Sequence, residues 1–277
     1  MNLTAIVRYV LLGHIRDRRL SYLGFIHSVL DSYRHLKKIK ILEIGIDKGH
    51  SALPIIHNLQ AMYDDFTYFG VDIKLSLGVL SAIDQMEGIT FRKKSPEEIT
   101  NVNLYEANSL SILPMMVEAG DTFDIIFLDG DHNYFTVISE LIYLEKLSHK
   151  GTVIVCDDYF GRYESNDLFY SEREEYKSLR VNESNTPELN SFGDPIVSAK
   201  KATPVISISV GGVKKAGVKT AVDEFINNSN LGWNIKSFSD VTNNREVEAV
   251  ILYQESGVKV ENNCTGDRPG VMIIHTS

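Results

Sequence analysis

Short apolar runs alternate with helix-length segments over most of this sequence. Five runs that end near Gly or Asp predict buried parallel strands at residues 39–44, 66–71, 102–107, 123–128 and 152–156. The intervals between them are long enough for helices, and the periodicity is clearest after Ser51 and over 134–147. This alternation predicts an α/β fold built on a parallel sheet.

The rest of the chain departs from this rhythm in three places. Residues 1–38 predict two amphipathic helices, and the main domain then extends over 39–260. The interval 160–212 is rich in Ser, Asn, Glu and Tyr, so we interpret it as an insertion after the fifth strand. Beyond it the pattern predicts a helix, two strands and an unassigned tail, at 213–226, 233–238, 248–253 and 261–277.

Composition narrows the class of protein. The 277 residues are 43% hydrophobic and 23% charged, as in an ordinary globular protein, and carry a net charge of -9. An acidic chain is a poor ligand for phosphate backbones, so we expect no nucleic-acid partner. The apolar segment 5–12 is too short to span a membrane and has no signal-peptide cleavage pattern. The two cysteines are too few for a disulfide framework. We therefore expect a cytoplasmic protein with no membrane partner.

A glycine-containing turn joins the first predicted strand to the helix that starts at Ser51. Gly45 and Gly49 allow a ligand to approach the backbone, and the helix N-terminus offers N–H groups to an anion. The spacing is G-x-x-x-G, which lacks the close glycine pair of nicotinamide-dependent oxidoreductases. Asp72 ends the second strand, where a carboxylate can accept both ribose hydroxyl protons of a nucleoside, although an Asp is also common in a turn.

Acidic residues gather after the fourth and fifth predicted strands. Asp129, Asp157 and Asp158 should lie at one edge of the sheet, where three carboxylates repel one another unless a cation such as Mg²⁺, Ca²⁺ or Mn²⁺ lies between them. Each of them alone could instead cap a helix. His132 has the chemistry of a general base or is a packing residue, and Asp131 either orients it or caps the next helix.

In order and spacing these motifs resemble the class I S-adenosylmethionine-dependent methyltransferases. The resemblance is closest to the metal-dependent O-methyltransferases of small molecules, a group that includes macrolide-sugar and catechol O-methyltransferases. The matching segments are 43–51, Asp72, Asn108–Ser109, 127–134, 151–159 and 217–225. His132 stands where catechol O-methyltransferase has a Lys base, and Asp158 where it has an Asn.

The resemblance implies a fold and a set of roles. The fold is a Rossmann-like, mostly parallel sheet of seven strands with an antiparallel last strand. Mg²⁺ would be held by Asp129, Asp157 and Asp158, and His132 and Asp129 would be catalytic. S-Adenosylmethionine would be bound by Glu43, Gly45, Gly49, Ser51, Asp72, Asn108, Ser109 and Asp129.

These implications define the function we expect and its alternative. The expected function is Mg²⁺-dependent methylation of a hydroxyl on a small molecule, a sugar or another natural product. The alternative is a non-catalytic protein that binds S-adenosylmethionine or S-adenosylhomocysteine. The insertion 160–212 is interpreted as a lid over the substrate, with a dimer contact or a disordered loop as alternatives, so both a monomer and a homo-oligomer stay open.

Overall fold

The computed structural model describes most of the main domain and the end of the N-terminal segment. The described residues are 26–27, 29–86, 88–89, 91–92, 101–157, 159, 208–210, 213–215, 217–237 and 250–254. Four features predicted above lie outside this set: the first N-terminal helix, Asp158, nearly all of the insertion 160–212, and the tail 261–277.

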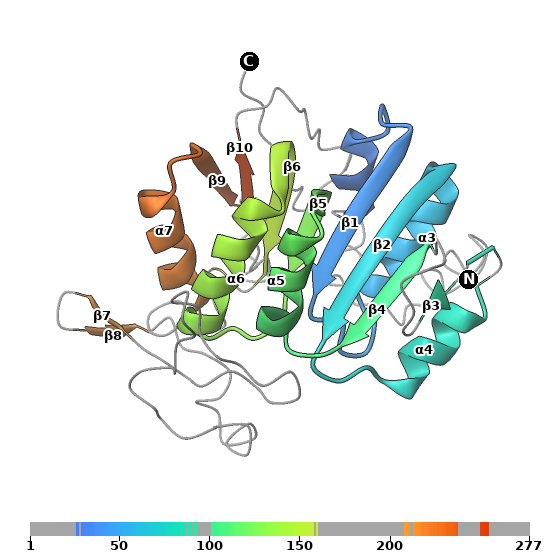
Figure 1. Ribbon diagram of the computed structural model, residues 1–277, viewed down its shortest axis with the longest axis horizontal. Helices are drawn as coiled ribbons and strands as arrows, with labels where there is room; N and C mark the ends of the chain where they lie inside the picture. Colours follow the sequence, from blue (N-terminus) through green and yellow to red (C-terminus); the bar gives the residue numbers. More distant parts are fainter. Residues whose placement is uncertain are drawn as a thin grey trace, which may run out of the picture.

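A single large sheet organises the domain (Figure 1). Its strand order is β3-β4-β2-β1-β5-β6-β10-β9, and the five central strands from β4 to β6 run parallel, which confirms the predicted α/β fold class. The strands are β1 Lys38–Ile44, β2 Asp65–Asp72, β3 Phe91–Arg92, β4 Val102–Glu106, β5 Phe123–Leu128, β6 Ser148–Cys156, β9 Trp233–Ser237 and β10 Val250–Gln254.

The sheet differs from the expected seven strands at one edge. β3 adds an eighth strand of only two residues, too short to show as a run in the sequence. At the other edge β10 pairs antiparallel with both β6 and β9. A separate pair, β7 Ile208–Val210 and β8 Val213–Lys215, lies apart from the main sheet in Figure 1.

Helices cover both faces of the sheet. They are α3 Ala52–Met62, α4 Leu77–Asp84, α5 Ser109–Glu118, α6 Tyr134–Lys146 and α7 Val218–Asn228. One buried cluster joins α3 and α4 to alternate residues of β1, such as Ile39 and Ile41, and the other joins α5, α6 and α7 to the intervening ones, such as Leu42 and Ile44. Among the described helices, none is long and apolar enough to cross a membrane.

The predicted helix over 213–226 is wrong at its start. Residues 213–215 form β8, and α7 begins only at Val218, after Gly217. Lys214 and Lys215 are compatible with a helix, but pairing with β7 holds them extended. The buried residues of α7, including Ala221, Val222 and Phe225, keep the predicted periodicity.

The register of the parallel strands brings five turns to one edge. Ile44 pairs with Val71 of β2 and with Leu128 of β5, and Leu128 pairs with Cys156 of β6. Residues just beyond these pairs, among them Gly45, therefore follow strands that end side by side. In Figure 1 the arrowheads of β1, β2 and β4 all point to this lower edge, where open α/β sheets bind ligands.

We expect substitutions on the buried face of α6 to lower stability far more than substitutions on its exposed face. Leu141 is fully buried and its neighbour Ile142 is 48% exposed. Leu141→Ala should lower the free energy of unfolding by about 2–5 kcal/mol because it leaves a cavity. Ile142→Ala should change it by less than about 0.5 kcal/mol. Urea unfolding of both variants checks this, and equal effects would contradict the packing described here.

Candidate functional site

The turn after β1 is built on a glycine that no other residue can replace without movement. Gly45 has φ +92°, and a Cβ placed on it would lie 1.9 Å from the carbonyl oxygen of Asp129. Its N–H donates to the carbonyl of Val71 at 2.9 Å, so the turn is held against β2 as well as against the turn after β5. The backbone of the glycine turn is therefore in direct contact with the backbone of the turn after β5.

The Asp72 carboxylate holds the glycine turn in place. Its Oδ2 accepts from the N–H groups of Ile46 at 2.7 Å and Asp47 at 2.8 Å, and its Oδ1 accepts from Lys74 N–H at 2.8 Å. A carboxylate has about four acceptor positions, and these three bonds leave one. We expected Asp72 to accept two ribose hydroxyl protons; in this geometry it has room for one, at Oδ1.

Glu43 lies inside the protein, beneath the glycine turn. Its carboxylate is fully buried, and it accepts hydrogen bonds from the hydroxyls of Ser51 and Tyr68, one on each oxygen. Burial raises the pKa of Glu43 to about 7. Glu43 and Ser51 were expected to contact the cofactor, but here they bind each other and tie the start of α3 to β1 and β2.

The predicted adenine-side residues begin α5. Asn108 is the N-cap, and its Oδ1 accepts from Leu110 N–H at 2.9 Å. The Ser109 hydroxyl donates to Oε1 of Glu140 on α6 at 2.5 Å. Glu140 is buried, and burial raises its pKa to about 8.

The acidic edge holds two of the three predicted metal ligands. Asp129 and Asp157 directly follow the paired ends of β5 and β6, and Asp157 N–H donates to the carbonyl of Leu128 at 3.0 Å. Nε2 of the buried His132 lies 3.5 Å from Oδ1 of Asp129. Within the described residues no three His, Cys, Asp or Glu side chains gather as a metal site needs, and Asp158 lies outside them.

Asp131 lies beside the start of α6 and hydrogen-bonds to side chains there. Its carboxylate accepts hydrogen bonds from the side chains of Asn133 and Thr136, the latter at 2.7 Å. Asn133 is the N-cap of α6. Asp131 thus holds side chains of the N-cap residue and of the first turn of α6, and burial raises the pKa of Asp131.

A family comparison agrees with this arrangement. Residues 42–159 match the model of a methyltransferase domain. The matched segment contains the glycine turn, Asp72, the start of α5 and the acidic edge. The match covers less than half of the chain. The resemblance to methyltransferases that the motifs indicated is therefore confirmed over this segment. Among curated proteins, none matches the sequence.

Solved structures with similar folds include several methyltransferases. The O-methyltransferase from Bacillus cereus with SAH is 16% identical, with 90% of this chain and 88% of that chain covered and a TM-score of 0.47. TomG from Streptomyces achromogenes, an O-methyltransferase involved in tomaymycin synthesis and solved with SAM, is 14% identical. The match covers 83% of this chain and 78% of that chain, with a TM-score of 0.45. The MycE methyltransferase from the mycinamycin biosynthetic pathway is 18% identical. The match covers 53% of this chain and 39% of that chain, with a TM-score of 0.36. These likenesses are too distant to assign a substrate.

Sequence reasoning missed two residues of the matched segment, Tyr68 and Glu140, that hydrogen-bond to predicted site residues. Tyr68 stands in an apolar strand, where nothing marks its hydroxyl as a partner of Glu43. Glu140 did carry a signal, because it shares the buried face of α6 with Val137, Leu141 and Leu144 at helical spacing. An acidic residue in an apolar stripe needs a partner.

We expect the Gly45 contact to be more costly to disturb than a positive φ alone. Gly120 also has a positive φ, +72°, but a Cβ there would meet nothing within 4 Å. Gly120→Ala should lower the free energy of unfolding by about 1–2 kcal/mol. Gly45→Ala should lower it by about 3 kcal/mol or more, because the two turns must also separate. Equal losses in urea unfolding would contradict the close contact.

The raised pKa of Glu43 predicts a pH dependence of stability. Between pH 4.5, the ordinary value, and about 7, the folded protein binds more protons than the unfolded chain, so the free energy of unfolding falls as pH rises. Glu43→Gln cannot titrate and should lack this fall. The free energy of unfolding of the wild type minus that of the variant should decrease by on the order of 3 kcal/mol across this pH window. Above about pH 8 the difference should stay constant. Parallel pH profiles in urea unfolding would contradict the buried carboxyl.

Proposed function

We propose that the chain is an S-adenosylmethionine-dependent, Mg²⁺-dependent O-methyltransferase. Its substrate is a hydroxyl on a small molecule, a sugar or another natural product. The observation that carries the proposal is the glycine turn held by Asp72 at the same sheet edge as Asp129 and Asp157, inside a methyltransferase domain.

The residues at this edge fit the cofactor. The remaining acceptor position of Asp72 Oδ1 suits one ribose hydroxyl, and the backbone of Gly45 and Gly49 suits the methionine part. Asn108 and Ser109, at the start of α5, are the residues that we assign to the adenine. When bound, S-adenosylmethionine supplies an electrophilic methyl group on a sulfonium sulfur.

The acidic residues fit a magnesium ion by their chemistry. Asp129 and Asp157 offer carboxylate oxygens from adjacent strand ends, the ligand type that Mg²⁺ prefers. Asp158 is the third ligand in this proposal. When bound, Mg²⁺ lowers the pKa of a coordinated substrate hydroxyl.

His132 takes the proton of that hydroxyl in this proposal. It is buried, and Asp129 lies 3.5 Å from its Nε2, so the carboxylate stabilises the imidazolium that forms. Bound S-adenosylmethionine would supply its methyl group to the deprotonated oxygen, and its sulfur would keep the electron pair of the S–C bond. The products are the methyl ether and S-adenosylhomocysteine, and no covalent enzyme intermediate is needed.

A non-catalytic protein that binds S-adenosylmethionine is the alternative. It would need the glycine turn and Asp72 but not a pair of carboxylates at neighbouring strand ends, which repel each other when no cation is present. Metal binding therefore separates the two functions without knowledge of the substrate.

We expect Asp157→Ala to lose the metal and keep the cofactor. Mn²⁺ titration followed by electron paramagnetic resonance reports metal binding, and calorimetry with S-adenosylhomocysteine reports the cofactor site. The variant should bind Mn²⁺ at least about tenfold more weakly, because one ligand of three is lost, and its S-adenosylhomocysteine affinity should change by less than about threefold, since Asp157 lies outside the proposed cofactor contacts.

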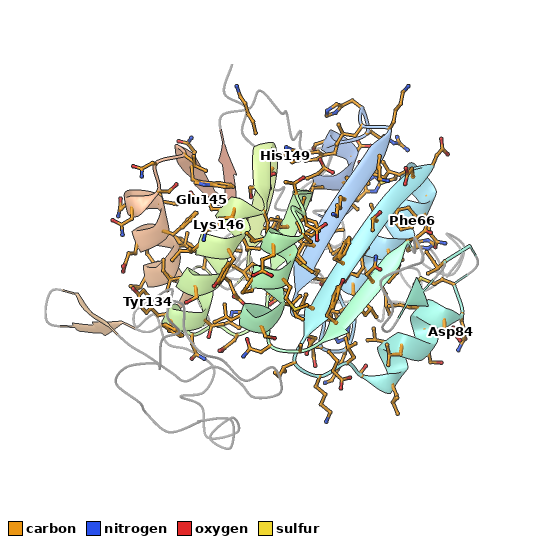
Figure 2. The ribbon with its side chains drawn as sticks, viewed as in Figure 1. Phe66, Asp84, Tyr134, Glu145, Lys146 and His149 are labelled. Atoms are coloured by element: carbon orange, nitrogen blue, oxygen red, sulfur yellow. The ribbon has the colours of Figure 1, made fainter. Side chains whose placement is uncertain are left out.

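Asp84→Asn is the matched control for this experiment. Asp84 is an exposed carboxylate at the end of α4 (Figure 2), so this variant should bind both ligands like the wild type. Wild-type protein that binds S-adenosylhomocysteine but no Mn²⁺ would favour the non-catalytic alternative and contradict the metal site.

A further inference from the structure

A tyrosine just beyond the acidic edge is held by α7. Tyr159 follows Asp157 by two residues, and its ring is buried in the cluster that joins α5, α6 and α7 to the sheet. Its hydroxyl lies 2.5 Å from Oδ1 of Asp223 and 3.1 Å from Nζ of Lys219, and both of these residues belong to α7. A helix from a distant part of the chain therefore contacts the turn after β6.

The polar groups of Tyr159, Lys219 and Asp223 satisfy one another. An ammonium only donates and an ionised carboxylate only accepts, so the hydroxyl accepts from Lys219 and donates to Asp223. Lys219 and Asp223 also form an ion pair one helical turn apart. The Lys219 ammonium lies 4.8 Å from the centre of the Tyr159 ring. Two charged groups of opposite sign therefore set the direction of the Tyr159 hydroxyl.

α7 is itself anchored at the same end. Glu224, the neighbour of Asp223, accepts a hydrogen bond at 2.8 Å from the hydroxyl of Tyr134, the first residue of α6. Figure 2 shows Tyr134 at the lower end of α6, and Figure 1 shows α7 beside this helix. Two consecutive acids therefore tie α7 to the start of α6 and to the turn after β6.

The turn after β6 is fastened at its start and again two residues later. At its start, the N–H of Asp157 donates to the carbonyl of Leu128 at the end of β5. Two residues later, Tyr159 binds α7. Carboxylates that converge without a cation repel one another, so the turn that carries them must be held against this repulsion. A turn that is already fixed also has less conformational freedom to lose when an ion binds.

We propose that Asp223 is a positioning residue for the metal ligands of the acidic edge and acts through the Tyr159 hydroxyl. The inference rests on the proposed function, in which Asp157 and Asp158 bind Mg²⁺. Asp223 is not a metal ligand in this proposal; it keeps the turn in the conformation that binds the ion. The glycine turn follows β1, which β5 separates from β6, so the loss of this bond should leave the cofactor position unchanged.

The test measures Mn²⁺ affinity by electron paramagnetic resonance and S-adenosylhomocysteine affinity by calorimetry without metal. Tyr159→Phe removes the hydroxyl and keeps the buried ring, and Asp223→Ala removes the acceptor. Each variant should bind Mn²⁺ about three- to tenfold more weakly than the wild type. Their S-adenosylhomocysteine affinity should stay within about threefold of the wild type. The double variant should bind Mn²⁺ no more weakly than the weaker single variant, because both changes break the same bond.

Three control variants separate positioning from structural support. Asp223→Asn keeps an oxygen that accepts from the Tyr159 hydroxyl and should retain the wild-type Mn²⁺ affinity. Val222→Ala leaves a cavity beside α7 and lowers the free energy of unfolding, but it keeps the bond. Ser229→Ala breaks a hydrogen bond to Glu145 at the opposite end of α7. Both of these variants should bind Mn²⁺ like the wild type; if α7 acted only through stability, Val222→Ala would weaken Mn²⁺ binding too.

Two results would overturn the positioning role while the metal site stands. One is Mn²⁺ binding by Tyr159→Phe that is as tight as that of the wild type, and this variant is decisive even if Asp223→Ala does not fold. The other is a double variant whose loss is the sum of the two single losses, because the two residues would then act separately. Wild-type protein that binds no Mn²⁺ contradicts the proposed metal site itself, and the positioning role falls with it.

Discussion

The functional edge of this protein depends on one contact between two stretches of backbone. Gly45, after β1, lies against the carbonyl of Asp129, after β5, so closely that a Cβ would lie 1.9 Å from that oxygen. The contact fixes the glycine turn beside the acidic turn, and Asp72 then holds the glycine turn from the β2 side with two amide hydrogen bonds. The proposed cofactor and metal positions adjoin because of this arrangement.

Carboxyl groups at this edge fall into two chemical environments. Asp72, Asp129 and Asp157 are partly exposed at strand ends, where they can meet ligands. Glu43 and Glu140 are buried below them, and burial raises the pKa of both. Each buried acid accepts a hydrogen bond from a serine at the start of a helix. The interior acids therefore orient the helix starts, and the partly exposed ones remain for chemistry.

Much of this fold was predictable because its central strands are buried on both faces. Residues 39–44, 66–71 and 123–128 are mostly apolar runs, and each lies within an observed strand. Prediction failed where strand pairing rather than composition decides the structure. β6 already begins at the polar residue Ser148, beside a register shift in its pairing with β5. β8 is extended only because it pairs with β7. The candidate site residues were predicted from strand ends, but Tyr68, one of the two partners of Glu43, lies in an apolar strand that gives no such signal.

We propose that the turn held by Asp72 binds the nucleoside part of S-adenosylmethionine. Calorimetric titration of wild-type protein and Asp72→Asn with S-adenosylhomocysteine tests it most directly, with Asp65→Asn as the control, because Asp65 is exposed at the opposite end of β2. The account predicts tight binding by the wild type and the control, and affinity at least about tenfold weaker for Asp72→Asn. Equal binding by all three proteins, or none by a folded wild type, would contradict it.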